Sequence, residues 1–101
     1  EIDTGISGRT AQMVSEKLSY IAKSHQVICI THLPQIAAMA DSHYEIAKTA
    51  ADGRTTTTIR PLGEAEMVEE LARLLGGAKI TDAVRENARE MKRLAGERKR
   101  P

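Results

Sequence analysis

The 101 residues predict an α/β fold with a parallel strand core, a β-hairpin and C-terminal helices. Three patterns support this class. Apolar residues recur at helical spacing over 9–24, and a continuous apolar run follows at 27–30. Two strand-like stretches then flank the turn signal Asp52-Gly53. A chain of this length forms one domain at most.

The first helix is predicted over residues 9–24, with Ser7 placed to act as its N-cap. The run Val27-Ile28-Cys29-Ile30 does not alternate, which indicates a strand buried on both faces with Cys29 in the core. A helix followed by such a strand implies a right-handed crossover from an earlier parallel strand. We expect that earlier strand to precede residue 1.

Later elements follow from turn and capping signals. Pro34 begins a second helix. Strands at 44–48 and 55–59 form a hairpin whose four threonines alternate between faces, so at least one face meets solvent. An amphipathic helix over 64–75 is closed by Gly76-Gly77. Thr81 or Asp82 caps a last helix that reaches about Leu94, before a frayed end.

Composition limits the partners that the chain requires. Apolar residues make up 41% of the sequence, but Phe and Trp are absent, so the core must be aliphatic. A net charge of +1 does not demand nucleic acid, and no apolar run has the length of a membrane span. The three histidines are widely spaced and Cys29 is alone, so no metal site is predicted.

Two segments carry candidate chemistry, the N-terminal residues 1–8 and Thr31-His32. Ligands of parallel sheets bind outside the carboxyl ends of the strands, where Glu1 and His32 would both emerge. A carboxylate there can activate water, and an imidazole can donate to a phosphate oxygen. Each has a structural alternative: the acidic residues as a helix cap, the histidine as a structural hydrogen-bonding residue.

Together these motifs identify a resemblance. The stretches Glu1-Ile2-Asp3-Thr4-Gly5-Ile6-Ser7-Gly8 and Val27-Ile28-Cys29-Ile30-Thr31-His32-Leu33-Pro34-Gln35-Ile36-Ala37-Ala38-Met39-Ala40-Asp41 resemble the C-terminal ATPase lobe of the bacterial RecN DNA-repair proteins. That family is related to the SMC and ABC-type ATPases, which implies part of a P-loop NTPase head. The similarity continues through 71–77 and 86–91 and covers nearly all of residues 1–101.

The resemblance implies roles by position. Glu1 matches the catalytic glutamate of the Walker B motif, and His32 matches the switch histidine near the γ-phosphate. The segment from Asp3 to Gly8 matches the D-loop between two heads, and its candidate ATP-site residues are Asp3, Thr4, Gly5, Ser7 and Gly8.

The same resemblance implies cofactors and partners. The parent protein would use ATP and Mg²⁺ in the repair of DNA double-strand breaks, in the cytoplasm and at the nucleoid. Its partners would be the N-terminal lobe of the same head, a second head in an ATP-sandwiched homodimer, and DNA. The sequence contains no phosphate loop with its lysine, no signature motif and no coiled coil, so this chain alone should neither bind ATP tightly nor hydrolyse it.

Two alternatives stay open from the residues. One is a head segment from another SMC-like chromosome-maintenance ATPase. The other is a non-catalytic module that binds DNA or a partner through the hairpin and the basic residues Arg98, Lys99 and Arg100.

Overall fold

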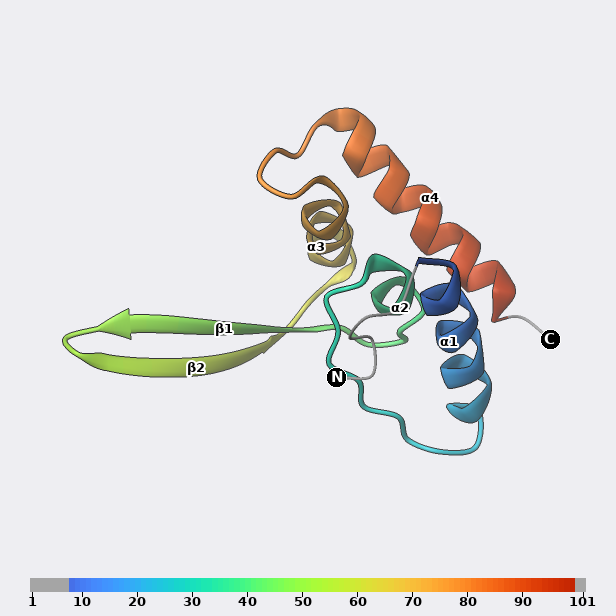
Figure 1. The fold of residues 1–101 in the computed structure, drawn as a ribbon, viewed down its shortest axis with the longest axis horizontal. Coiled ribbons are helices and arrows are strands. Elements are labelled where there is room, and N and C mark those ends of the chain that lie inside the picture. The colour runs from blue at the N-terminus through green and yellow to red at the C-terminus, as the bar shows by residue number, and fades with distance from the viewer. Residues whose placement is uncertain (1–7, 100–101) are drawn as a thin grey trace.

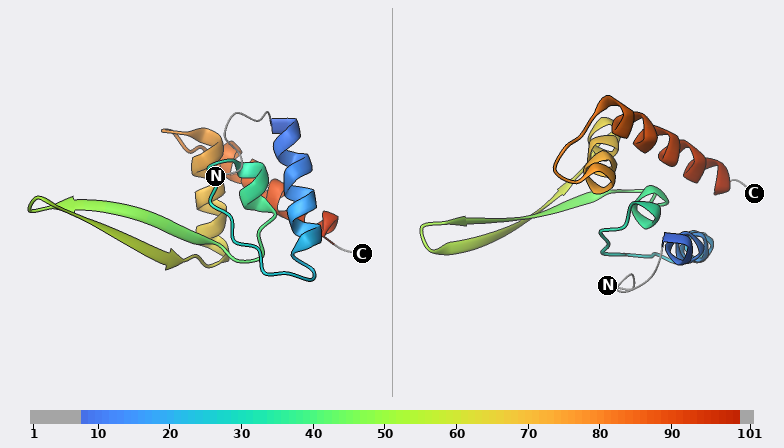
Figure 2. Two further views of the ribbon diagram at one scale, coloured as in Figure 1. Left: turned by 60° about the horizontal axis from the view of Figure 1, so that its bottom comes forward. Right: turned by 45° about the horizontal axis from the view of Figure 1, so that its top comes forward.

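The computed structural model describes residues 8–99, which form a helical body with one projecting β-hairpin (Figure 1). The molecule measures 50 × 34 × 28 Å along its principal axes. Two further views show the hairpin extending away from the helices in every orientation (Figure 2). The elements in chain order are α1 (Gly8–Ile21), α2 (Pro34–Ala38), β1 (Tyr44–Ala51), β2 (Arg54–Pro61), α3 (Glu64–Gly76) and α4 (Asp82–Arg98).

The hairpin confirms the predicted turn. Asp52 and Gly53 both have a positive φ, of 52° and 74°, which is the backbone that a two-residue type I′ turn requires. The strands pair antiparallel from Ala51↔Arg54 at the turn to Tyr44↔Pro61 at the base, and they are longer than predicted. Residues on both faces of β2 are exposed, so the hairpin meets solvent on two sides.

Capping residues define the two C-terminal helices. Thr81 Oγ1 accepts a hydrogen bond from the Val84 N–H at 3.2 Å, which confirms the predicted N-cap of α4. At the end of α3, Gly77 has a φ of 65° and donates its N–H to Arg73 O at 2.9 Å. The last helix continues to Arg98, beyond the predicted end near Leu94. Ion pairs of Arg93 with Glu90 and Glu97 support this extra turn.

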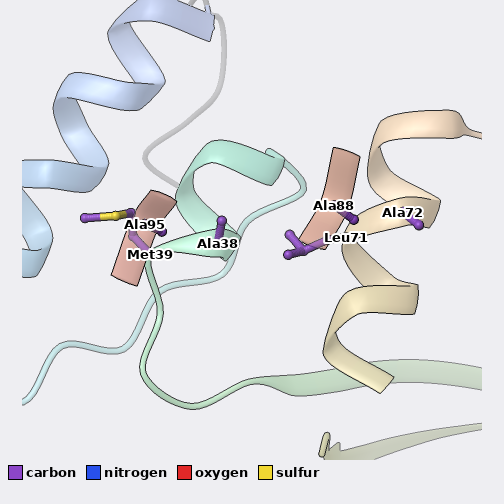
Figure 3. Close-up of a cluster of buried hydrophobic side chains, with 6 residues drawn as sticks. All are labelled: Ala38, Met39, Leu71, Ala72, Ala88 and Ala95. Atoms are coloured by element: carbon purple, nitrogen blue, oxygen red, sulfur yellow. The ribbon is translucent and has the colours of Figure 1, made fainter. Parts of the chain in front are cut away.

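The core lies where α2, α3 and α4 meet (Figure 3). Leu71 of α3 is 1% exposed and is the largest fully buried apolar side chain. Small side chains on the facing helices let the backbones approach closely. The prediction of an aliphatic core is confirmed, with alanine as its main component: the cluster contains Ala38, Met39, Leu71, Ala72, Ala88 and Ala95.

The predicted parallel strand core is wrong for the described residues. The run at 27–30 lies in an irregular connection over 26–33, where Ile28 is 85% exposed, Ile30 is 59% exposed and Cys29 is exposed. A buried parallel strand needs hydrogen-bonded strands beside it and cover on both faces. Within residues 8–99 the one sheet is the hairpin, whose strands pair with each other, so this run has neither. Ser7 and the proposed strand before residue 1 lie outside the described residues.

Candidate functional site

His32 lies exposed near the end of the irregular connection, two residues before α2 begins. Thr31 Oγ1 accepts a hydrogen bond from the Leu33 N–H at 3.0 Å, which turns the chain into the helix. Leu33 is the extended N-cap residue and Pro34 is the first helical position, where a missing N–H costs nothing. His32 is therefore carried on a short turn whose position depends on α2.

Gly8 lies beside the same helix. It is the first residue of α1, and a Cβ added to it would lie 3.2 Å from Nε2 of Gln35, the second residue of α2. The absence of a side chain at position 8 thus allows the start of α1 to approach α2. The structure brings this D-loop candidate next to the helix that follows His32.

Five further candidate residues lie outside the described part of the chain: Glu1, Asp3, Thr4, Gly5 and Ser7.

One polar atom near Gly8 is notable, because Gln35 Oε1 is buried and has no hydrogen-bond partner among residues 8–99. A buried carbonyl oxygen of this kind is an acceptor available to a donor from outside that range.

A polar junction closes the opposite end of α2. The Lys92 ammonium of α4 donates to Ala38 O at 3.0 Å and to Ala40 O at 2.8 Å. It also lies 3.2 Å from Nε2 of His43, the residue before β1. These four residues form what we call the Lys92 junction, which joins α4, the end of α2 and the base of the hairpin.

A second cation stands beside this junction. Lys99 Nζ lies 2.9 Å from Asp41 Oδ1 and 3.5 Å from Ala40 O. Burial, together with the nearby Lys99 charge, lowers the pKa of Lys92 to about 8, against the opposing effect of the carboxylates of Asp41 and Glu64.

The histidine of the junction is held neutral. Burial lowers the pKa of His43 to about 4, and the charges of Lys92 and Lys99 act in the same direction. A hydrogen bond with the Ala40 backbone opposes this shift. At neutral pH, Nε2 is consequently an acceptor for the ammonium rather than a second cation.

Sequence reasoning missed Lys92 as a residue of interest. The apolar face of α4 contains Ala88 and Ala95, and Lys92 lies four residues after the first and three before the second. It therefore occupies the buried stripe of the helix. A lysine at such a position is a signal that its ammonium has acceptors inside the protein.

A hollow of about 380 Å³ lies between the hairpin base and α3. The charged side chains at its rim pair with one another, because Arg60 contacts both Glu45 and Glu66, and Arg73 contacts Glu70.

Within residues 8–99, no three His, Cys, Asp or Glu side chains lie close enough to hold a metal ion. None of the described helices is long and apolar enough to cross a membrane.

Comparison with known proteins links these segments to one family. No family model matches the chain. It is 50% identical to the DNA repair protein RecN of Bacillus subtilis over 91 residues, which are 90% of this chain and 16% of that protein. It is also 50% identical to the RecN of Halalkalibacterium halodurans over 95 residues, or 94% of the chain and 17% of that protein.

A more distant relative gives the same result. The DNA repair protein RecN of Haemophilus influenzae is 44% identical over 91 residues, 90% of this chain and 16% of that protein. The chain thus spans about one sixth of the length of these relatives. Identity at this level over nine tenths of the chain confirms the resemblance deduced from the motifs. The chain belongs to the RecN family.

Proposed function

We propose that the chain is the C-terminal lobe of an ATPase head in a DNA repair protein that acts on double-strand breaks. The observation that supports this most is the 50% identity over 91 residues with a protein named for DNA repair. The structural support is the position of Gly8 against α2, the helix that follows His32. In this proposal, the N-terminal segment 1–8 and the turn that contains His32 contribute to one ATP site.

The proposed residue roles follow from their chemistry. Glu1 takes a proton from the attacking water, and His32 donates a hydrogen bond to the γ-phosphate as charge develops there. Asp3, Thr4, Gly5, Ser7 and Gly8 line the crossing between two heads. Bound Mg²⁺ neutralises charge on the phosphates of ATP. An exposed side chain on an anchored turn, as His32 is, can meet a ligand supplied from outside the chain.

The N-terminal lobe of the same head is the partner that we propose for the exposed apolar residues. Ile28 and Ile30 on the connection are 85% and 59% exposed. On the hairpin, Ile46 and Ile59 are 49% and 67% exposed and face each other in the strand register. Apolar surface of this kind is typical of a region that a partner covers.

In the complete protein, covering the run at 27–30 with neighbouring strands would supply the parallel sheet that residues 8–99 lack. We also propose that the complete protein forms a homodimer with ATP bound between its two heads and that it acts on DNA. Its proposed location is the cytoplasm, in association with the nucleoid.

A second candidate function uses the hairpin. It projects from the body, exposes both faces, and carries Lys48, Arg54 and four consecutive threonines. Lysine, arginine and threonine all contact DNA phosphates. A module of this kind would bind DNA without ATP, and its affinity would fall steeply as salt is raised.

The test compares two exposed histidines in a full-length RecN protein that carries this segment. His32→Ala should lower ATP turnover by roughly 10²- to 10³-fold, the usual cost of losing a donor to a developing negative charge. The matched control is His25→Ala, since His25 is also exposed but contacts Ser24 beside it. If H32A hydrolyses ATP as fast as H25A and the wild type do, the proposed role of His32 is contradicted. Salt-sensitive DNA binding by this chain without nucleotide would favour the second candidate.

A further inference from the structure

The Lys92 junction is a complete acceptor set for one ammonium group. A protonated lysine has three N–H donors. Ala38 O, Ala40 O and His43 Nε2 lie 3.0, 2.8 and 3.2 Å from Nζ, so one acceptor is available for each donor. The acceptors come from positions 49 to 54 residues away in sequence. Their convergence therefore depends on the folded chain.

Two of these acceptors lie at and just beyond the C-terminal end of α2. Ala38 O is the last carbonyl of the helix, and Ala40 O lies two residues past that end. The C-terminal end of a helix carries partial negative charge, which the ammonium of Lys92 complements. Since α2 begins two residues after His32, an interaction that holds its far end also holds the turn on which His32 stands.

The helix α2 has five residues, of which Ile36 and Ala38 are buried, and it packs against α1, α3 and α4. A hydrogen-bonded contact at its end adds a directional constraint to this apolar packing. Lys92 reaches from α4, which packs on α3, and its hydrogen bonds to Ala38 O and Ala40 O link the end of α2 to this pair of helices. At the start of α2, the Gln35 side chain lies beside Gly8.

We propose that Lys92 is a positioning residue for His32: by holding Ala38, Ala40 and His43, it fixes the register of α2 and thereby the place of the imidazole in the ATP site. The inference rests on the proposed function, because it assigns Lys92 to the same site. Lys92 touches no substrate itself. Its effect passes through α2.

The protonation state of Lys92 predicts a second measurable effect, the dependence of ATP turnover on pH. Losing a proton leaves an amine with two donors for three acceptors. Burial and Lys99 lower the pKa of Lys92 to about 8, against the opposing carboxylates of Asp41 and Glu64. His43, with a pKa of about 4, stays neutral throughout this range. The junction should accordingly weaken as the pH rises through 8.

The experiment measures ATP turnover by a full-length RecN protein that carries this segment. Lys92→Met keeps most of the length of the side chain, being one atom shorter, and removes its donors. We expect kcat to fall by roughly tenfold to a hundredfold, as for a small displacement of a catalytic group, while KM changes less than twofold. Lys17→Met, at an exposed lysine on α1, is the matched control and should leave both constants unchanged.

The pH profile distinguishes positioning from simple stabilisation. The wild-type profile should contain a step near pH 8 that is missing from K92M, whose side chain does not titrate. If K92M fails to fold, His43→Leu tests the same junction, because it leaves one N–H of Lys92 without its acceptor. We expect it to lower kcat below the wild-type value while KM changes less than twofold, and a wild-type kcat in a folded H43L protein would overturn the role of Lys92.

Each result has a distinct meaning. A folded K92M protein with wild-type kcat and an unchanged profile would overturn the role of Lys92, even if H32A had lowered turnover as expected. Loss of turnover in H32A together with a lower kcat in K92M supports both proposals. If the wild-type protein hydrolyses no ATP, the proposed function fails first, and the role of Lys92 fails with it.

Discussion

Gly8 and Gln35 lie so close that a methyl group at position 8 would approach the Gln35 amide nitrogen at 3.2 Å. That distance is shorter than an ordinary van der Waals contact. We expect Gly8→Val to destabilise the chain by about 1 kcal/mol, the lower end of the usual cost of overpacking, because the amide at the end of the Gln35 side chain has to move aside. Urea unfolding measures this change, and the size of the m-value tests whether the transition stays two-state.

The partner residue supplies the control for this prediction. In a Gln35→Ala background the amide is gone, so Gly8→Val should cost less than in the wild type. We expect a coupling of about 0.5–1 kcal/mol between the two positions. Additive effects would mean that the valine is accommodated without disturbing Gln35, contrary to the geometry.

Replacing Gln35 by methionine tests the buried oxygen. Gln35 Oε1 is buried without a partner in the described part of the chain, so the native amide gives up hydration there for no hydrogen bond. Gln35→Met keeps the volume and removes that group. We expect this chain to be unchanged or more stable by up to about 1 kcal/mol, measured as a shift in the urea midpoint. A loss of more than that amount would mean that Oε1 has a donor.

Thr81→Ala should weaken the start of α4. The variant removes the acceptor of the Val84 N–H and should cost about 1 kcal/mol of stability. Thr81→Ser retains the hydroxyl and should restore most of the loss. Thermal unfolding of the three proteins compares them directly. If serine and alanine were equally destabilising, the hydrogen bond would not be the cause.

His43 should make stability depend on pH in the weakly acidic range. Its folded pKa is about 4, below the ordinary value of 6.5, so the unfolded chain binds more protons between these values. Stability therefore rises with pH from about 4 to 6.5 and is lost as the pH falls through that window. For a half-buried group, solvent screening leaves about 1–2 kcal/mol of this effect.

His43→Gln is the variant that isolates this contribution. Glutamine offers Lys92 an amide oxygen as acceptor but does not titrate. The difference in unfolding free energy between the two proteins should change across pH 4–6.5 and be constant above pH 7. Parallel pH curves would show that the histidine is not the group responsible.

The exposed pair Ile46 and Ile59 should promote self-association of the isolated chain. Both face the same side of the hairpin and are half-exposed or more. Ile59→Lys should lower the concentration dependence of the sedimentation coefficient with little loss of stability, since exposed positions tolerate substitution. Thr57→Lys adds the same charge on the same face nearer the turn. An equal effect of T57K would assign the change to charge instead of the apolar pair.

Local signals in the sequence predicted most of the elements. The turn at Asp52-Gly53, the cap at Thr81 and the closing glycine at Gly77 each act within a few residues, and each is found where expected. The run at 27–30 was different. A buried strand depends on neighbouring strands, and residues 8–99 contain none to pair with it.

The candidate site was predictable to a smaller extent. The motif containing His32 stands out in the sequence, and its position before a proline-initiated helix could be deduced. The approach of Gly8 to Gln35 could not, because it depends on how two helices pack. Lys92 was missed for the same reason. Its three acceptors lie some fifty residues earlier, and no local pattern links them.

The proposed catalytic base, Glu1, offers the sharpest test of ATPase function in this segment. In a full-length RecN protein that carries this segment, Glu1→Gln keeps the size of the side chain and removes its basicity. Turnover and equilibrium ATP binding should be measured on the same samples. We expect turnover to fall by roughly 10²-fold or more while ATP binding is retained. Wild-type turnover in E1Q would contradict it.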